Sequence, residues 1–133
     1  MIQGIQYIEA VKSYYSFLIH EFNFDIITEK VRGNTFYEVE YGNTQRIISI
    51  SYENIEDYFR VILFILENGE RPDYDDKTRT LHLNTLNNSI LKNVEKDAFI
   101  LNEKYFSNYK AESKIEAKLL KEAKELRLYL TNS

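Results

Sequence analysis

The fold is decided by residues 33–66, which read GNTFYEVEYGNTQRIISISYENIEDYFRVILFIL. Apolar and polar residues alternate through most of this stretch, and a period of two is typical of strands with one buried face. The pairs Gly33-Asn34 and Gly42-Asn43 separate the alternating segments, and these residues tolerate the positive φ angles of tight turns. The stretch therefore predicts antiparallel strands over 35–41, 46–52 and 58–66. The predicted buried faces hold Tyr37, Val39 and Tyr41 in the first strand and Ile48, Ile50 and Tyr52 in the second.

The segments on either side extend this meander. Residues 5–22 carry apolar side chains at spacings of three and four, which predicts an amphipathic helix. Residues 24–29 then alternate with a period of two and predict one more strand, the first of four. The segment 58–66 is apolar on both faces, so we expect it to be covered on both sides. Asn68-Gly69 predicts the turn that ends it.

The C-terminal part of the chain returns to the helical period. Residues 71–79 are polar and hold the single proline, Pro72, which predicts an exposed loop. Residues 80–83 fit either a short fifth strand or the approach to a helix, and residues 84–105 fit one helix or two broken near Asn93. A last helix is predicted over 111–130. The predicted apolar stripe of the segment 84–105 consists of Leu86, Ile90, Val94, Ala98, Leu101 and Tyr105.

Together these segments predict one α+β domain over residues 1–133. It has an N-terminal helix, a four-stranded antiparallel meander, and two or three C-terminal helices packed on the sheet. A chain of 133 residues with 44% hydrophobic residues has the size and composition of a single packed domain. No apolar run reaches the roughly 20 residues of a membrane helix, and residues 1–4 do not begin a secretory signal. We therefore expect a cytoplasmic protein with no membrane partner.

The sequence has few features of catalysis or metal binding. It contains no cysteine, and His20 and His82 lack the spacing of a metal-binding helix. Asp73, Asp75 and Asp76 suggest calcium, but the glycine and distal glutamate of an EF-hand loop are missing, and a solvated acidic loop is the simpler explanation. We expect no metal, no cofactor and no enzyme activity. An enzyme with a site assembled from dispersed carboxylates and His82 is an alternative.

Charge is unevenly distributed along the chain. The net charge is −4, yet residues 53–76 hold eight acidic residues against two arginines. A negative field repels nucleic acid phosphates, so we expect no nucleic-acid partner. The acidic stretch fits either an ordinary solvated exterior or a surface that attracts a basic protein. Glu38 and Glu40 lie outside it, on a strand face predicted to point to water.

Tyrosine is abundant, with 11 of 133 residues, and tryptophan is absent. The preference of tyrosine for strands explains Tyr37 and Tyr41. Tyrosine also supplies a large contact area with a polar tip and is frequent in binding hot spots. For the tyrosines near the acidic segments, our hypothesis is this second role in binding. The candidate partner-binding residues are Tyr52, Glu53, Glu56, Asp57, Tyr58, Asp73, Tyr74, Asp75 and Asp76.

In its acidity, its lack of cysteine and its acidic, tyrosine-bearing segments 52–58 and 73–76, the chain resembles the small α+β immunity proteins of bacterial toxin–immunity systems. The resemblance implies a non-enzymatic inhibitor that binds a basic partner or toxin tightly, without a cofactor. The alternative is a structural or assembly protein that acts as a homo-oligomer and buries the apolar strand 58–66 or the last helix between copies.

Overall fold

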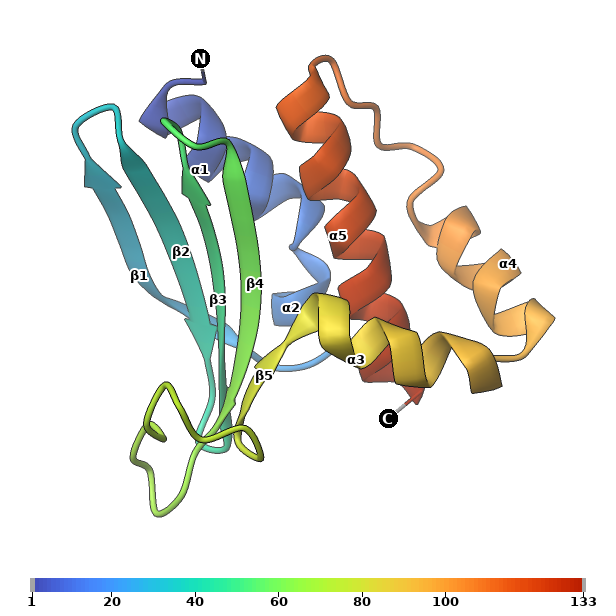
Figure 1. Cartoon of the computed structure of the whole chain (residues 1–133). Helices are drawn as coiled ribbons and strands as arrows, with labels where there is room; N and C mark the ends of the chain where they lie inside the picture. The colour runs from blue at the N-terminus through green and yellow to red at the C-terminus, as the bar shows by residue number, and fades with distance from the viewer. Residues whose placement is uncertain (1, 133) are drawn as a thin grey trace. The chain divides into compact units, whose positions relative to one another are not determined.

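The computed structural model describes residues 2–132, without the side chains of residues 87–90. The chain forms two compact units, Met1–His82 and Leu83–Ser133, called here the N-terminal and C-terminal units. The predicted α+β order is confirmed, with an N-terminal helix, an antiparallel sheet and then C-terminal helices (Figure 1). One domain over 1–133, with the C-terminal helices packed on the sheet, stays a prediction.

The sheet of the N-terminal unit has five antiparallel strands in the order β1-β2-β3-β4-β5. The first four are the strands of the predicted meander. The fifth resolves the open interpretation of residues 80–83, because residues 80–82 pair with residues 62–64 of β4. This pairing satisfies backbone groups at the edge of an apolar strand, which explains five strands rather than four. The strands are β1 (Asp25–Arg32), β2 (Phe36–Gly42), β3 (Arg46–Glu53), β4 (Tyr58–Ile65) and β5 (Thr80–His82).

Glycine and asparagine form the turns that the sequence predicted. Gly33 has a φ of 52° between β1 and β2, and Asn68 and Gly69 have φ angles of 53° and 79° after β4. After β2, the Oδ1 atom of Asn43 accepts two backbone N–H groups of the following turn, both at 2.8 Å. These local bonds direct each strand back beside the previous one.

The helix predicted over 5–22 is divided into α1 (Gly4–Tyr14) and α2 (Phe17–His20). Between them the N–H of Leu18 donates to the carbonyl of Tyr15 at 3.0 Å, so the chain tightens to a spacing of three residues. This tightening places Tyr15 and Phe17, only two residues apart, fully inside the core.

α1 covers one face of the sheet through aromatic side chains. The Tyr7 hydroxyl donates to the carbonyl of Ile50 in β3 at 3.0 Å, and the Tyr7 ring lies 5.5 Å from Tyr37 and 6.0 Å from Tyr52. Gly4 allows this approach, because a Cβ at that position would stand 2.7 Å from a methyl of Val31. The predicted burial of Tyr37, Val39 and Tyr41 is confirmed.

The C-terminal unit is helical, and the alternative of two helices broken near Asn93 is confirmed. A 3-10 turn over Leu91–Asn93 separates the two helices. The side chain of Ile90, a predicted stripe residue, lies outside the described residues. The helices of this unit are α3 (Leu83–Ile90), α4 (Lys96–Tyr105) and α5 (Lys114–Asn132).

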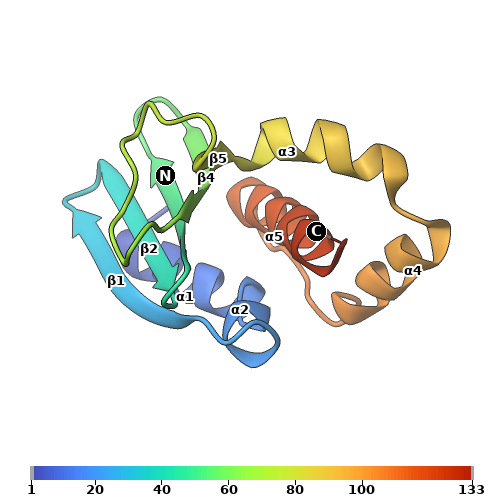
Figure 2. The ribbon, with the colours of Figure 1, turned by 90° about the horizontal axis from the view of Figure 1, so that it is seen from below.

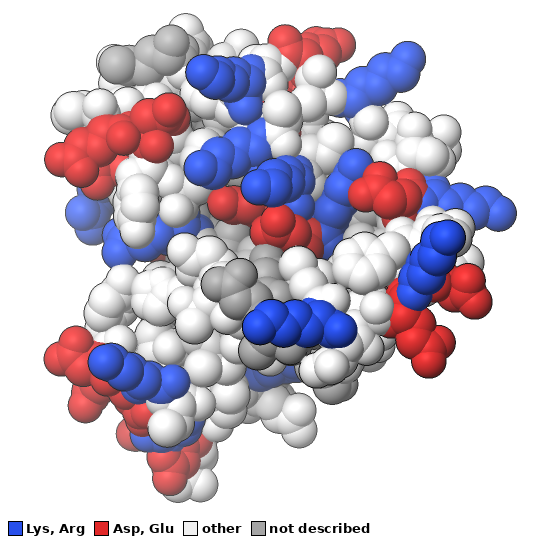
Figure 3. All heavy atoms as spheres, turned by 45° about the vertical axis from the view of Figure 1, so that its right-hand side comes forward, with Lys and Arg blue, Asp and Glu red and all other residues white. Residues whose placement is uncertain are grey.

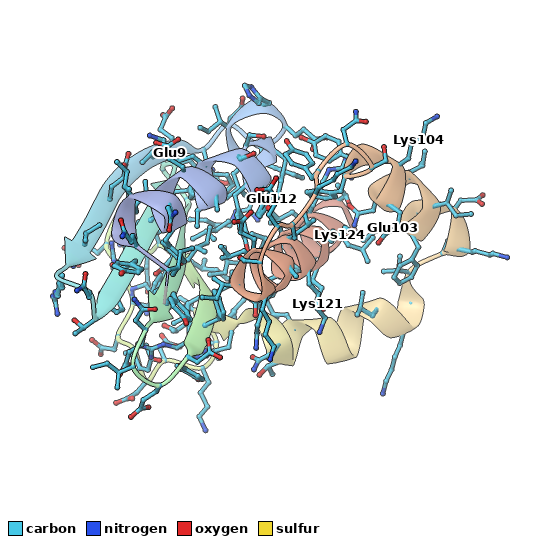
Figure 4. The ribbon with its side chains drawn as sticks, turned by 90° about the horizontal axis from the view of Figure 1, so that it is seen from above. Glu9, Glu103, Lys104, Glu112, Lys121 and Lys124 are labelled. Carbon is cyan, nitrogen blue, oxygen red and sulfur yellow. The ribbon has the colours of Figure 1, made fainter. Side chains whose placement is uncertain are left out.

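The predicted apolar stripe is wrong at Leu101, which is 65% exposed, while the polar Asn102 is buried. Asn102 occupies the interface between α4 and α5: its Nδ2 donates to the carbonyl of Lys124 at 2.9 Å, and its Oδ1 accepts from Arg127 at 2.8 Å. Beside it, Glu103 and Lys124 point toward each other and pair at 3.1 Å (Figure 4). An amide is stable in such an interface when both of its ends are hydrogen-bonded. Because α4 turns Asn102 toward α5, Leu101 lies outside the buried face of α4.

Candidate functional site

The β3–β4 connection is held in place by Asn54. Its Nδ2 lies within 3.0 Å of the carbonyls of Ile2 and Asn34 and of the Tyr37 hydroxyl, and the backbone N–H of Asn54 donates to Thr35. Asn54 therefore ties together three segments that are far apart in sequence. With its first residue held inward, the connection presents its charged neighbours to solvent.

Asp57 ends this connection in a left-handed conformation, with a φ of 51°. Its Oδ1 accepts a hydrogen bond from the Tyr52 hydroxyl at 2.7 Å. The Tyr52 ring itself is 2% exposed and packs on Phe59 at 4.3 Å. Burial, and then the hydrogen bond to Asp57, raise the pKa of Tyr52 to about 12. Tyr52 is therefore a core residue that positions Asp57, and its ring offers no surface to a partner.

The β4–β5 loop, residues 66–79, extends past the end of β4 and folds back toward the sheet (Figure 2). Arg71 donates to both carboxylate oxygens of Glu40 on β2, at 2.8 and 3.4 Å, and its guanidinium lies 5.2 Å from the Phe64 ring. Pro72 beside it is buried. The prediction that Glu40 points to water is therefore wrong: Glu40 is 6% exposed, because the loop places a cation over it.

Asp76 has an internal role in the same loop. Its carboxylate accepts from the N–H and hydroxyl of Thr78, at 3.0 and 2.6 Å, and from Nε of Arg79 at 3.0 Å. The hydrogen bonds of Thr78, and then that of Arg79, lower the pKa of Asp76 to about 2. Arg79 also pairs with Glu67. A calcium site formed by Asp73, Asp75 and Asp76 would lack its third ligand, because the Asp76 oxygens already accept hydrogen bonds from Thr78 and Arg79.

Arg60 joins the two acidic segments. Its guanidinium lies 5.6 Å from the ring of Tyr58, and its Nη1 donates to the Tyr74 hydroxyl at 2.9 Å. The Tyr74 ring also meets the edge of His82 at 5.8 Å. Tyr58 and Tyr74 are 53% and 54% exposed. Tyr58 of β4 and Tyr74 of the β4–β5 loop are thus connected by one cation, and each still presents about half of its surface.

The candidate carboxylates are exposed or partly exposed and lie toward the two ends of β4. Glu53 pairs with Tyr58 at the start of β4, and the carbonyl of Asp73 accepts from Thr80, which pairs with Phe64 near its end. In the described part of the chain, no hydrogen bond or ion pair occupies the carboxylates of Glu53, Glu56, Asp73 or Asp75. Of the nine candidate residues, the structure connects Tyr58 and Tyr74 through Arg60 and gives Tyr52 and Asp76 internal roles. The seven candidates other than Tyr52 and Asp76 are called here the tyrosine–acid surface: Glu53, Glu56, Asp57, Tyr58, Asp73, Tyr74 and Asp75.

Sequence reasoning missed Arg60, Arg71 and Glu40. Arg60 stands two residues after Tyr58 on one strand, and residues at this spacing share a face, so the pattern contained this signal. Arg71 and Glu40 are separated by strands β3 and β4 with their turns, and no local pattern connects them.

A hollow of about 270 Å³ opens within the β4–β5 loop. Its two arginines, Arg71 and Arg79, are both bonded to carboxylates. The hollow is therefore a polar depression whose cations are already neutralised. It is lined by Glu67, Asn68, Glu70, Arg71, Pro72, Asp73 and Arg79.

Charges of both signs are mixed over the face of the protein seen in Figure 3. Within the described residues, no three His, Asp or Glu side chains are grouped as a metal site requires. No helix in the part of the chain that the structure covers is long and apolar enough to cross a membrane. No family model, curated protein or solved structure matches the chain.

Proposed function

We propose that the chain is a non-enzymatic protein-binding domain that holds a basic protein on the tyrosine–acid surface, as an immunity-type inhibitor holds its toxin. The observation that carries the proposal is the bridge from Arg60 to Tyr58 and Tyr74, which links the start of β4 to the β4–β5 loop. Without the bridge, the acidic segments would be separate solvated loops.

The charge of this surface supports a basic partner. The surface has five carboxylates, and those of Glu53, Glu56, Asp73 and Asp75 are without a cation among the described residues. Fields of this kind raise the association rate of an oppositely charged protein and weaken as salt is added. Binding through these residues is therefore expected to depend strongly on ionic strength.

The tyrosines supply contact area at little entropic cost. Tyr58 and Tyr74 each have one side engaged with Arg60, so their rings are partly ordered before a partner arrives. Side chains that are ordered in advance lose less conformational entropy on binding. Half-exposed aromatic rings of this kind are frequent binding hot spots.

The test begins with the tagged chain as bait in its native cell, followed by a salt series and mass spectrometry. The captured protein is then produced alone, and its affinity is measured by calorimetry for the wild type and two double variants. Asp73→Lys with Asp75→Lys reverses two charges of the tyrosine–acid surface. Glu9→Lys with Glu112→Lys makes the same charge change at two exposed carboxylates elsewhere (Figure 4).

The proposal predicts a stoichiometric basic partner whose affinity falls at least about tenfold with the first double variant and less than about twofold with the second. Tyr74→Ala should weaken binding by about tenfold or more, and Tyr74→Phe by less, because phenylalanine keeps the ring. Equal losses in both double variants would mean that overall charge, rather than this surface, governs the affinity. Unchanged affinity in the first would refute the proposed surface.

One observation favours self-assembly as the second candidate function. Ile100 and Leu101 on α4 are exposed, and Phe99 next to them is 37% exposed. By contrast, the residues of β4 from Val61 to Phe64 are buried, so that strand has no free apolar face for a second copy. A mass that rises with protein concentration, and that Leu101→Lys returns to the monomer, would support assembly through α4 instead of inhibition.

A further inference from the structure

The turn after β4 consists of Asn68 and Gly69 alone. Glu67 and Glu70 flank it and exchange two backbone hydrogen bonds, at 3.0 and 2.9 Å. Both central residues have positive φ, at 53° and 79°. The turn is exposed, and one backbone bridge closes it, so its two central residues open more easily than the paired strands do.

Asparagine followed by glycine is reactive in a specific way. The backbone nitrogen of the next residue attacks the side-chain amide carbon, and a glycine in that place hinders the attack least because it has no Cβ. Four observations favour this attack at Asn68: its side chain is exposed, its amide makes no hydrogen bond among the described residues, the N–H of Gly69 donates none there either, and no atom lies within 4 Å of where a Cβ on Gly69 would stand.

Other asparagines lack this combination. The side-chain oxygen of Asn43 accepts two backbone N–H groups, and a β-branched threonine follows it. Asn54 and Asn102 are buried and bonded. Asn23 has a left-handed φ of 60°, but a bulky phenylalanine follows it. In the whole sequence, Asn68 is the one asparagine followed by glycine.

We propose that Asn68 is a site of spontaneous deamidation, which adds a carboxylate to the β4–β5 loop as the protein ages. The Gly69 nitrogen gives its proton to solvent base and bonds to Cγ of Asn68. The bond from Cγ to Nδ2 breaks, and ammonia leaves with one proton from water. Water then opens the resulting five-membered imide at either carbonyl, giving aspartate or isoaspartate. No oxidant or reductant takes part.

The product changes the hollow in the loop. Asn68 lines it together with Glu67, Glu70 and Asp73, so a fourth acidic group enters a site with two arginines already neutralised. The isoaspartate product also lengthens the backbone by one carbon within the turn. That extra carbon disrupts the bridge between Glu67 and Glu70.

The experiment incubates the purified full chain at about pH 8 and samples it over days. Proteolysis and mass spectrometry then give the fraction of amide converted to acid at each asparagine. Asn43, which lies in the β2–β3 turn of the same molecules, is the internal control. An Asn68→Asp variant gives the reference position on anion-exchange chromatography, and Asn68→Gln shows whether the acidic form stops accumulating.

We expect Asn68 to convert at least about tenfold faster than Asn43. The new chromatographic form should match the Asn68→Asp variant, with isoaspartate as a second form, and should be absent from Asn68→Gln. Equal rates at Asn68 and Asn43 would overturn the proposal. So would an acidic form that accumulates unchanged in Asn68→Gln, because its charge would then come from another residue.

Discussion

Replacing Arg71 by methionine tests whether one ion pair holds the β4–β5 loop against the sheet. Glu40 is 6% exposed, and both of its oxygens accept from Arg71. Methionine retains an apolar contact with the Phe64 ring but leaves the buried carboxylate without a cation. Removing one partner of a buried ion pair costs about 3–5 kcal/mol. Since the Arg71 side chain is 44% exposed, water can reach Glu40, and we expect about 3 kcal/mol.

The measurement is urea unfolding of the full chain, with two comparisons. Glu40→Gln combined with Arg71→Met removes both charges and should restore at least half of the lost stability, because no uncompensated charge is left. Lys12→Met removes the exposed pair between Lys12 and Glu29, at 3.4 Å, and should change stability by less than about 0.5 kcal/mol.

Two results would refute this reasoning. The first is a loss below about 1 kcal/mol for Arg71→Met, the range of an exposed pair. The second is a double variant no more stable than Arg71→Met alone, which would mean that the charge of Glu40 is not the source of the loss.

Three further predictions concern the rest of the chain. Asn54→Ala removes hydrogen bonds to Ile2, Asn34 and Tyr37 and should lower the free energy of unfolding by about 2–3 kcal/mol in urea; a loss as small as that of an exposed asparagine would contradict its anchoring role. Burial raises the pKa of Glu122 from 4.5 to about 7, so the fold favours its protonated form and stability falls as pH rises from about 4.5 to about 7. Glu122→Gln should therefore add about 3 kcal/mol above pH 7 and nothing at pH 4, and a pH-independent gain would exclude titration as the cause. If residues 1–133 are one domain, tyrosine fluorescence and far-ultraviolet circular dichroism should report one coincident thermal transition; two separated transitions would mean that the two units unfold independently.

The strands were predictable because their signals are local. Alternation with a period of two assigns each side chain to a face, and the turn residues fix where each strand stops. The predicted strands 35–41 and 46–52 are found as Phe36–Gly42 and Arg46–Glu53. The same alternation correctly placed Val39 in the core. It also placed Tyr52 there, although the interface preference of tyrosine had suggested a partner-binding role for this residue.

The failures have a common physical cause. A prediction of burial from a hydrophobic pattern assumes that polar side chains stay in water. A polar group with a complete set of hydrogen-bond partners is nevertheless stable when buried. Asn102 is buried because Lys124 and Arg127 of α5 bond both ends of its amide. Glu40 is buried because Arg71 covers it. In each case the partner lies more than 20 residues away in sequence, beyond the reach of any periodicity.

Bonding to Arg79 separates the acidic side chains of the β4–β5 loop into two groups. Glu67 and Asp76 are bonded to Arg79, so their charges contribute to the folding of the loop. Asp73 and Asp75 carry equal charge without a cation among the described residues, so the fold gains little from them. We therefore expect a change at Asp76 to lower the free energy of unfolding, and a change at its neighbour Asp75 to lower the affinity for the partner. An Asp75→Asn variant with an unchanged urea midpoint but weaker binding would identify a recognition surface. Parallel losses at Asp75 and Asp76 would mean that the acidity of the loop serves its folding alone.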